Sequence, residues 1–515
     1  MYRFIYYKSL RMCNRSHSTS FNKWESVVGL EVHALLNTNS KLFSGAQNTF
    51  GGVVNSCVSL FDAAIPGTLP VLNRKCVELG IKTALALSCK VNEVSSLDRK
   101  HYFYADLPAG YQITQQRAPL ASDGVINFQV FTPGFHKKPY KKSSKIKQIQ
   151  LEQDSGKSLH DAELKRSLVD LNRAGAPLIE VVFEPDLQDG EEAAALVKEL
   201  VLIVQRLGAC TGRMEEGALR VDANVSIRRP GDPLSTRTEI KNIGSIRGVA
   251  GAVRYEIERQ KTVLENGGRI INETRAWDAV GRATIPMRDK EVVQDYRYMP
   301  EPNLPPLRVN LKSKHDTQHV ISVPLIQEQI PELPESSRKN LIENYQLRPE
   351  AAIQIVNEPI LLKYFVDLAE ERSQSTKIAN LLINELLTVL NKNKLDISDC
   401  PITLRQLKEL FKLFFDKKIS LEVFKNVLDD LVISSDSDKM PSKIIQERNW
   451  TLISDETEIT KFCIEIIENN PKLVKQYKEG KVKVLKALLG VMSKNSQNKF
   501  DMSLASRIME EVLKK

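Results

Sequence analysis

Apolar and polar residues alternate with the period of a strand in the first half of the chain. The clearest alternation lies in segments 25–36, 177–185, 219–227 and 236–243, and it predicts half-buried strands because successive side chains of a strand point to opposite faces. Segments 191–208 and 246–268 carry apolar residues at helical spacing and end at glycines, as helices commonly do. Strands and helices mixed over residues 24–310 predict one α+β body.

The pattern changes after the proline-rich segment 300–307. Glycines become rare, and apolar residues recur at helical spacing, for example over 351–371 and 404–418. A polar stretch at 433–443 precedes shorter helical patterns at 480–494 and 505–515. We therefore expect the body to be followed by an all-α helical domain over 311–448 and a small α-helical tail domain over 449–515.

Residues 1–23 differ from the rest of the chain. They contain five Lys or Arg, a Ser/Thr cluster and no acidic residue before Glu25. This composition is typical of a mitochondrial transit peptide, whereas a secretory signal would need a clean apolar segment that is absent here. We expect the segment to be removed and the protein to reside in the mitochondrial matrix.

Composition excludes a few classes of protein but does not identify one. Lys and Arg number 73 against 64 Asp and Glu, a net charge of +9 with a pI near 9.0, which permits a polyanionic partner without requiring one. The seven cysteines are odd in number and form no C-x-x-C pair, so neither a disulfide scaffold nor a zinc site is indicated. No apolar run approaches the roughly 18 residues of a membrane span, and we expect no membrane association.

Acidic residues on the predicted strands are the candidates for chemistry. Glu31 and His33 share a strand face at roughly 7 Å spacing, and together they could ligate a divalent ion. Glu180, Asp222 and Glu239 lie on the other half-buried strands, where a carboxylate needs a cation to offset the cost of burial.

The cation could come from the protein or from solution. Surface salt bridges to Arg220, Arg237 and Lys241 would satisfy the acids without any metal. Oxygen ligands otherwise favour Mg²⁺, and Mg²⁺ would indicate phosphoryl transfer or phosphodiester hydrolysis. The segment 154–158 ends like a phosphate-binding loop, but Leu151 stands where that loop needs a glycine, so any nucleotide site is of another kind.

Seven segments of the chain, in order and with matching spacing, resemble the GatB family. They are 27–44, 98–115, 151–161, 169–186, 214–228, 236–260 and 295–307, and segment 470–494 is similar to the family's tail. The resemblance implies a cradle-shaped α+β catalytic domain. It also implies a reaction that uses ATP and Mg²⁺ to phosphorylate the side-chain carboxylate of Glu-tRNA(Gln). Ammonia released by an amidase, the A subunit of the complex, then displaces the phosphate, and a small C subunit completes the complex on tRNA(Gln).

The resemblance also assigns residues, one position at a time. The implied metal ligands are Glu31, His33, Gln153, Glu180, Asp222 and Glu239. The implied catalytic residues are Glu31, His33, Glu180 and Lys100, and the implied contacts with the nucleotide are Lys100 and Lys157.

Two positions depart from the family pattern. Gln153 stands at the second glutamate of the family's H-x-E-E-D-A-G-K segment, so Glu152 or Asp154 is expected to supply the lost charge. Ala109 stands where bacterial members often carry lysine.

The tail and the carboxylates leave other functions open. Segment 471–515 has 11 Lys or Arg against 4 Asp or Glu, a difference of +7, which favours tRNA binding by the tail, although a merely solvated surface has the same composition. A Mg²⁺-dependent ribonuclease would use the same acids without ATP. A non-catalytic RNA-binding scaffold would assemble normally after the acids were removed.

Overall fold

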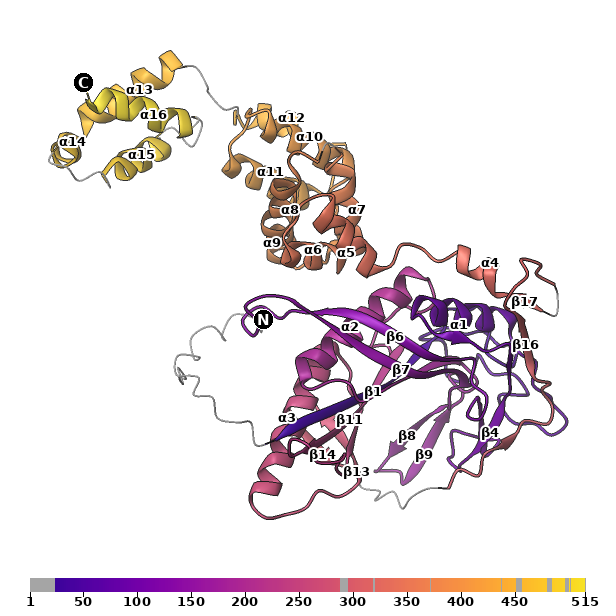
Figure 1. The fold of residues 1–515 in the computed structure, drawn as a ribbon. Coiled ribbons are helices and arrows are strands. Elements are labelled where there is room, and N and C mark those ends of the chain that lie inside the picture. Colours follow the sequence, from indigo (N-terminus) through magenta and orange to yellow (C-terminus); the bar gives the residue numbers. More distant parts are fainter. Residues whose placement is uncertain are drawn as a thin grey trace. The chain divides into compact units, whose positions relative to one another are not determined.

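The computed structural model describes residues 24–287, 295–317, 320–370, 372–436, 438–450, 456–478, 484–495, 500 and 502–514. The predicted transit peptide, residues 1–23, lies outside the described residues. The contacts divide the chain into two compact units, Met1–Glu335 and Ser336–Lys515. Strands gather in the first unit and helices make up the second, which confirms the predicted fold class (Figure 1).

A nine-stranded sheet forms the centre of the first unit, in the order β14-β13-β12-β11-β1-β10-β7-β6-β2. Neighbours run antiparallel except β12 and β13, which are parallel. The strands are β1 (Glu25–Leu35), β2 (Lys90–Val91), β6 (Ala121–Val130), β7 (Tyr140–Gln153), β10 (Pro177–Phe183), β11 (Leu219–Arg228), β12 (Thr238–Lys241), β13 (Glu273–Asp278) and β14 (Ala283–Pro286).

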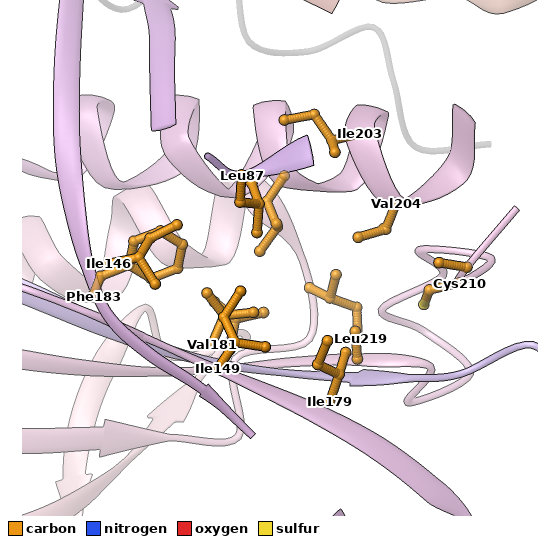
Figure 2. Packing of buried hydrophobic residues seen from close by; sticks show 14 of the residues in the cluster. Leu87, Ile146, Ile149, Ile179, Val181, Phe183, Ile203, Val204, Cys210 and Leu219 are labelled. Carbon is orange, nitrogen blue, oxygen red and sulfur yellow. The ribbon is translucent and has the colours of Figure 1, made fainter. Parts of the chain in front are cut away.

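Three helices, α1 (Arg74–Ala86), α2 (Gly190–Arg206) and α3 (Ile246–Glu265), cover one face of this sheet. Asp189 and Ser245 cap α2 and α3, each side chain accepting a hydrogen bond from the first helical turn, which satisfies an otherwise unpaired backbone donor. Figure 2 shows Ile179 and Val181 of the sheet facing Ile203 and Val204 of α2 across the core. Only the opposite face of the sheet is left for polar side chains.

Short sheets complete the body. They are β15-β4-β5, β17-β16-β3 and the β8–β9 hairpin, and β5 also contacts β7. Their strands are β3 (Val94–Ser95), β4 (Asp98–His101), β5 (Tyr111–Thr114), β8 (Lys157–Asp161), β9 (Arg166–Asp170), β15 (Met299–Pro300), β16 (Leu307–Asn310) and β17 (Ile321–Ser322).

The body extends past its predicted limit at residue 310. Ile321 of β17, with Val323 and Ile326 of α4 (Val323–Glu328), is buried in the same core as the central sheet. The first unit therefore continues to Glu335, because these apolar side chains would otherwise be exposed to water.

The second unit is helical in its described residues. Its elements are α5 (Pro334–Glu343), α6 (Pro349–Val356), α7 (Pro359–Leu368), α8 (Ser375–Leu381), the π-helical turn η1 (Leu382–Leu386), α9 (Leu387–Lys392), the 3₁₀ turn η2 (Ile397–Asp399), α10 (Leu404–Phe415), α11 (Leu421–Ser434), α12 (Pro441–Glu447), α13 (Glu456–Asn469), α14 (Pro471–Lys478), α15 (Val484–Asn495) and α16 (Met502–Lys514).

The helical pattern predicted over 351–371 is two helices, since Pro359 lacks the N–H that a continuous helix would need and instead starts α7. Apolar residues of α6 to α12 form one core, and those of α13, α15 and α16 form another. The boundary near 449 stays a prediction. None of the described helices is long and apolar enough to span a bilayer.

The start of α2 lies directly against the backbone of α3. A Cβ on Gly190 would lie 2.3 Å from the carbonyl oxygen of Ala250. We expect Gly190→Ala to push the two helices apart and lower the free energy of unfolding by about 1–3 kcal/mol, a typical range for overpacking. Gly244→Ala, where a Cβ would meet nothing within 4 Å, is the control. Denaturant unfolding of both variants measures the difference, and equal stabilities would contradict this packing.

Candidate metal centre

The strands of the central sheet sort their side chains strictly by face. On β1, Val28, Leu30 and Val32 are buried beneath the helices, so Glu31 and His33 point to the opposite face. The same alternation on β10, β11 and β12 sends apolar residues to the core and polar residues to this face. We call it the polar face of the sheet.

Strand register brings the polar residues of neighbouring strands together. Glu180 of β10 lies opposite His33, and Asp222 of β11 lies opposite Glu31. Gln150 of β7 lies opposite Glu180. Residues selected by strand alternation on β1, β10 and β11 thus converge from segments that are far apart in the sequence, and β7 adds Gln150.

His33, Glu152 and Glu180 form the tightest group. Nε2 of His33 lies 3.2 Å from Oε1 of Glu152 and 3.8 Å from Oε1 of Glu180. One potential ligand atom from each residue lies within 4.8 Å of the others, and no other group of at least three His, Cys, Asp or Glu in the described residues meets this criterion. Thr114 donates a hydrogen bond to Glu152 and Gln150 donates one to Glu180, which fixes both carboxylates. We call these three residues the ligand cluster.

Electrostatics set the charges within the ligand cluster. Burial alone would lower the pKa of His33, but its hydrogen bond to Glu152 and the charges of Glu152 and Glu180 raise it to about 9. Burial also favours a higher pKa for Glu152, yet the hydrogen bond from His33 brings that pKa below its usual range. Burial and the charge of Glu152 raise the pKa of Glu180. The two carboxylates thus favour the protonated form of His33.

Lys100 reaches the same site from β4. Its Nζ lies 4.9 Å from the ring centre of Tyr296 and 5.9 Å from that of Tyr102, distances at which a cation is attracted to an aromatic face. Burial alone would lower the pKa of Lys100, but the charges of Glu152 and Glu180 help to raise it. Lys100 is therefore a charged ammonium beside the ligand cluster.

A second acidic group lies next to the first on the polar face. Glu31, Asp222 and Glu239 meet there, and burial together with the charges of Glu239 and Asp222 raises the pKa of Glu31. Nζ of Lys241 lies 3.6 Å from Asp222 and 3.4 Å from Glu239. The salt-bridge alternative therefore holds in part for this group.

The donor atoms in both groups suit a divalent cation. Carboxylates and one imidazole are ligands for Mg²⁺ or Mn²⁺, and the separations within the ligand cluster need only small side-chain shifts to surround an ion. In the second group Asn224 donates to Glu31 at 3.3 Å. The side-chain oxygen Oδ1 of Asn224 is buried without a hydrogen-bond partner among the described residues. A buried oxygen of this kind is a natural ligand for a cation.

Gln153 does not join the ligand cluster. Ile149 and Leu151 of β7 are completely buried in the core, and Gln153 has their parity, so its side chain points away from the polar face while Glu152 points toward it. Gln153 instead lines a cavity of about 310 Å³. Of the two residues expected to replace the family's second glutamate, the structure places Glu152 with His33.

The remaining candidates lie apart from the ligand cluster. Asp154 forms ion pairs with Arg220 at 2.9 Å and Arg173 at 3.2 Å. Ala109 lines the same cavity as Gln153. Lys157 begins β8 with an exposed side chain, and its contact with a nucleotide stays a prediction.

Several groups at the site carry no signal in the sequence pattern. Thr114, Tyr102 and Tyr296 are brought in by the small sheet β15-β4-β5 and the segment that leads into it. Gln150 and Glu152 could have been found by extending strand alternation along β7 from the buried residues Ile149 and Leu151.

The first unit thus combines a mixed sheet that is covered by helices on one face with a carboxylate–imidazole cluster and an adjacent lysine on the other, a donor set that could hold a divalent cation. Comparison with known protein families identifies the family of this chain. The profile of the GatB/GatE catalytic domain matches residues 26–314, and that of the GatB domain matches residues 363–513.

Relatives that match nearly the whole chain are members of the same family. The chain is 56% identical over 500 residues to the B subunit of the mitochondrial glutamyl-tRNA(Gln) amidotransferase of Aedes aegypti, covering 96% of this chain and 94% of the relative. It is 46% identical over 497 residues to the human protein of the same name, covering 96% and 89%. It is 42% identical over 494 residues to the B subunit of the aspartyl/glutamyl-tRNA(Asn/Gln) amidotransferase of Rickettsia bellii, covering 95% and 98%. The chain belongs to the GatB family of tRNA-dependent amidotransferase subunits, in its mitochondrial form.

The assignment of Glu152 rather than Gln153 can be tested directly by metal binding. Glu152→Gln keeps the size of the side chain but removes a ligand charge, and we expect it to weaken Mg²⁺ binding by at least tenfold. Gln153→Ala should leave the affinity unchanged because its side chain lies on the other face. Calorimetric titration of Mg²⁺ into both variants makes the comparison, and equal losses would mean that β7 has a different register.

Proposed function

We propose that the polar face of the sheet binds ATP with Mg²⁺ and phosphorylates the side-chain carboxylate of glutamate attached to tRNA(Gln). The observation that carries the proposal is the ligand cluster of His33, Glu152 and Glu180 with the ammonium of Lys100 beside it. Phosphoryl transfer depends mainly on positioning and on neutralising negative charge, and this site combines fixed carboxylates with a fixed cation.

The proposed chemistry proceeds in two displacements. An oxygen of the glutamate carboxylate attacks the γ-phosphorus, the bond to the β–γ bridging oxygen breaks, and ADP leaves. Ammonia from the amidase partner then attacks the carbonyl carbon, and inorganic phosphate leaves with the former carboxylate oxygen. The product is Gln-tRNA(Gln) for translation in the mitochondrial matrix, made by a ligase that this chain forms together with the amidase and a small third protein.

Each part of the site has a distinct task in this reaction. The ligand cluster would hold one Mg²⁺, and Glu31, Asp222, Asn224 and Glu239 would hold another. An ion held by these residues would supply positive charge that neutralises phosphate oxygens. Thr114 and Gln150 keep the carboxylates of Glu152 and Glu180 oriented through hydrogen bonds.

Lys100 would hold the transferred group. Its ammonium is positioned over the faces of Tyr296 and Tyr102, and it would donate hydrogen bonds to phosphate oxygens as charge shifts toward ADP. Lys157 is a second proposed phosphate contact. The tail domain, with its excess of basic residues in 471–515, would bind the tRNA backbone away from the reacting end.

Removing a ligand tests the proposal. We expect His33→Ala and Glu180→Ala each to lower the rate of tRNA-dependent ADP formation by at least 100-fold in the complex with the partner subunits, because each change opens the ligand cluster. Assembly should be unchanged by size-exclusion chromatography, since both side chains lie on the polar face and outside the core. Glu258→Ala on the solvent side of α3 is the control.

The same assay separates the alternatives. Wild-type turnover of either variant at saturating Mg²⁺ would remove these residues from the site. Cleavage of the tRNA backbone without ATP would indicate a nuclease, and normal assembly without any ATP consumption by the wild-type complex would indicate a scaffold.

A further inference from the structure

The hairpin of β6 and β7 carries an unusual density of positive charge. Residues 124–151 contain six lysines and no aspartate or glutamate. The lysines are Lys137, Lys138, Lys141, Lys142, Lys145 and Lys147. Such a segment is free of the alternating charges that neutralise an ordinary exposed strand.

Strand register turns part of this charge toward the polar face. Val182 lies opposite Gln148, but its neighbour Phe183 lies opposite Ile146, so Lys147 is an extra residue in a β-bulge. The bulge shifts the alternation by one residue. Ile146 is therefore buried, and Lys145 is exposed on the face that also carries Gln148 and, further along the same strand, Glu152.

Alternation from Lys145 continues the basic surface outward. Lys141 lies four residues before Lys145 and on the same face of β7. At roughly 3.4 Å per residue, Lys145 lies about 24 Å and Lys141 about 37 Å from Glu152 along the strand. Lys137 and Lys138, both exposed, lie in the loop just before β7. We call Lys137, Lys138, Lys141, Lys145 and Lys147 the lysine track.

Most of this charge is not neutralised by the protein. Lys141 pairs with Glu335 at 2.5 Å, and Lys142, outside the track, pairs with Glu192. The side chains of Lys137, Lys138, Lys145 and Lys147 form no ion pair or hydrogen bond within the described part of the chain. Two acids follow β10 beside Lys145: the carboxylate of Asp186 accepts a hydrogen bond from the backbone N–H of Lys145, and the N–H of Glu184 donates to the carbonyl oxygen of Lys145.

We propose that the lysine track binds the sugar–phosphate backbone of the RNA acceptor arm and guides its aminoacylated end to the ligand cluster. The proposal rests on the proposed function, which places the RNA-linked glutamate at Glu152 and Glu180. Lys141 and Lys145, four residues apart on one face of β7, are about 14 Å apart along the strand. A stacked nucleic-acid strand presents one phosphate per roughly 3.4 Å, so each lysine can meet a phosphate without reading the base sequence.

The position of the track favours RNA over an anionic membrane. Lys145 lies on the same face of β7 as Glu152 of the ligand cluster, and a polymer lying along β7 would reach that cluster with its end. The opposite face of the hairpin is covered by α2, through Tyr140 and Lys142 on Glu192. If the track bound a lipid surface instead, its position on the same face as the ligand cluster would have no explanation.

Charge reversal at two track positions tests the proposal in the complex with the partner subunits. We compare Lys145→Glu/Lys147→Glu with a control, Lys75→Glu/Lys261→Glu, which changes the same charge on helices α1 and α3 of the opposite face. The dissociation constant for Glu-tRNA(Gln) is measured at several salt concentrations. We expect the track variant to bind at least tenfold more weakly near 0.1 M salt.

The salt dependence should identify the lost contacts. The slope of log affinity against log salt should become shallower by about 1.4 to 1.8, from two phosphate contacts at roughly 0.7 each for single strands and 0.9 for duplex. KM for tRNA should rise while kcat at saturating tRNA is retained. The control should match the wild type. Lys145→Gln/Lys147→Gln, which removes charge without introducing repulsion, should show the same shallower slope with a smaller loss of affinity.

Other outcomes would overturn the proposal. Equal affinity and slope in the track variants and the wild type would show that RNA does not lie on β7. Unchanged RNA affinity with lost binding to vesicles containing an anionic phospholipid would assign the track to a membrane. If RNA binding depends on the track but the wild-type complex forms no Gln-tRNA(Gln) from ATP and glutamine, the track stands and the proposed function fails.

Discussion

The alternation of side chains across the central sheet is the constraint on which the site depends. The helices bury one face completely, with Val32, Ala34 and Val181 among residues exposed by 1% or less, so polar side chains of the same strands must emerge together on the other face. Moving β10 by one residue, for example, would exchange Glu180 for Val181 and bury a carboxylate in the core. The same strand register therefore determines which apolar residues stabilise the core and which polar residues form the ligand cluster.

The small sheet β15-β4-β5 completes what the central sheet begins. It places the hydroxyl of Thr114 against Glu152 and the ammonium of Lys100 against the rings of Tyr102 and Tyr296. It is itself anchored by buried acids: Asp98 binds Arg117, and Glu301 binds Arg99 in a two-point contact. Paired and hydrogen-bonded charges of this kind are costly to break one partner at a time, which keeps β4 in place over the ligand cluster.

Sequence alternation predicted the parts of the site that lie on regular strands. Glu31, His33, Glu180, Asp222 and Glu239 all emerge on the polar face, and the GatB resemblance added Lys100. Gln153 was assigned by its position in a motif, whereas its side chain follows the parity of the buried residues before it.

Longer-range features could not be predicted in this way. The bulge at Lys147 breaks the alternation of β7, so the sequence shows no strand pattern through the hairpin. The separation of the ligands into two groups depends on strand register, which alternation within one strand does not determine. The predicted end of the first domain at residue 310 is too early. The proline-rich segment resembles a domain boundary, but Ile321 and Ile326 beyond it are buried in the core of the first unit.

The central claim is that the glutamate carboxylate accepts the γ-phosphoryl group on the polar face of the sheet. Isotope tracing tests it most directly. Glu-tRNA(Gln) labelled with ¹⁸O in the side-chain carboxylate is converted by the complex with ATP, Mg²⁺ and glutamine, and the released phosphate is analysed by mass spectrometry. The account predicts one ¹⁸O atom in each inorganic phosphate formed with Gln-tRNA(Gln). Label found in AMP, or phosphate free of label, would contradict it.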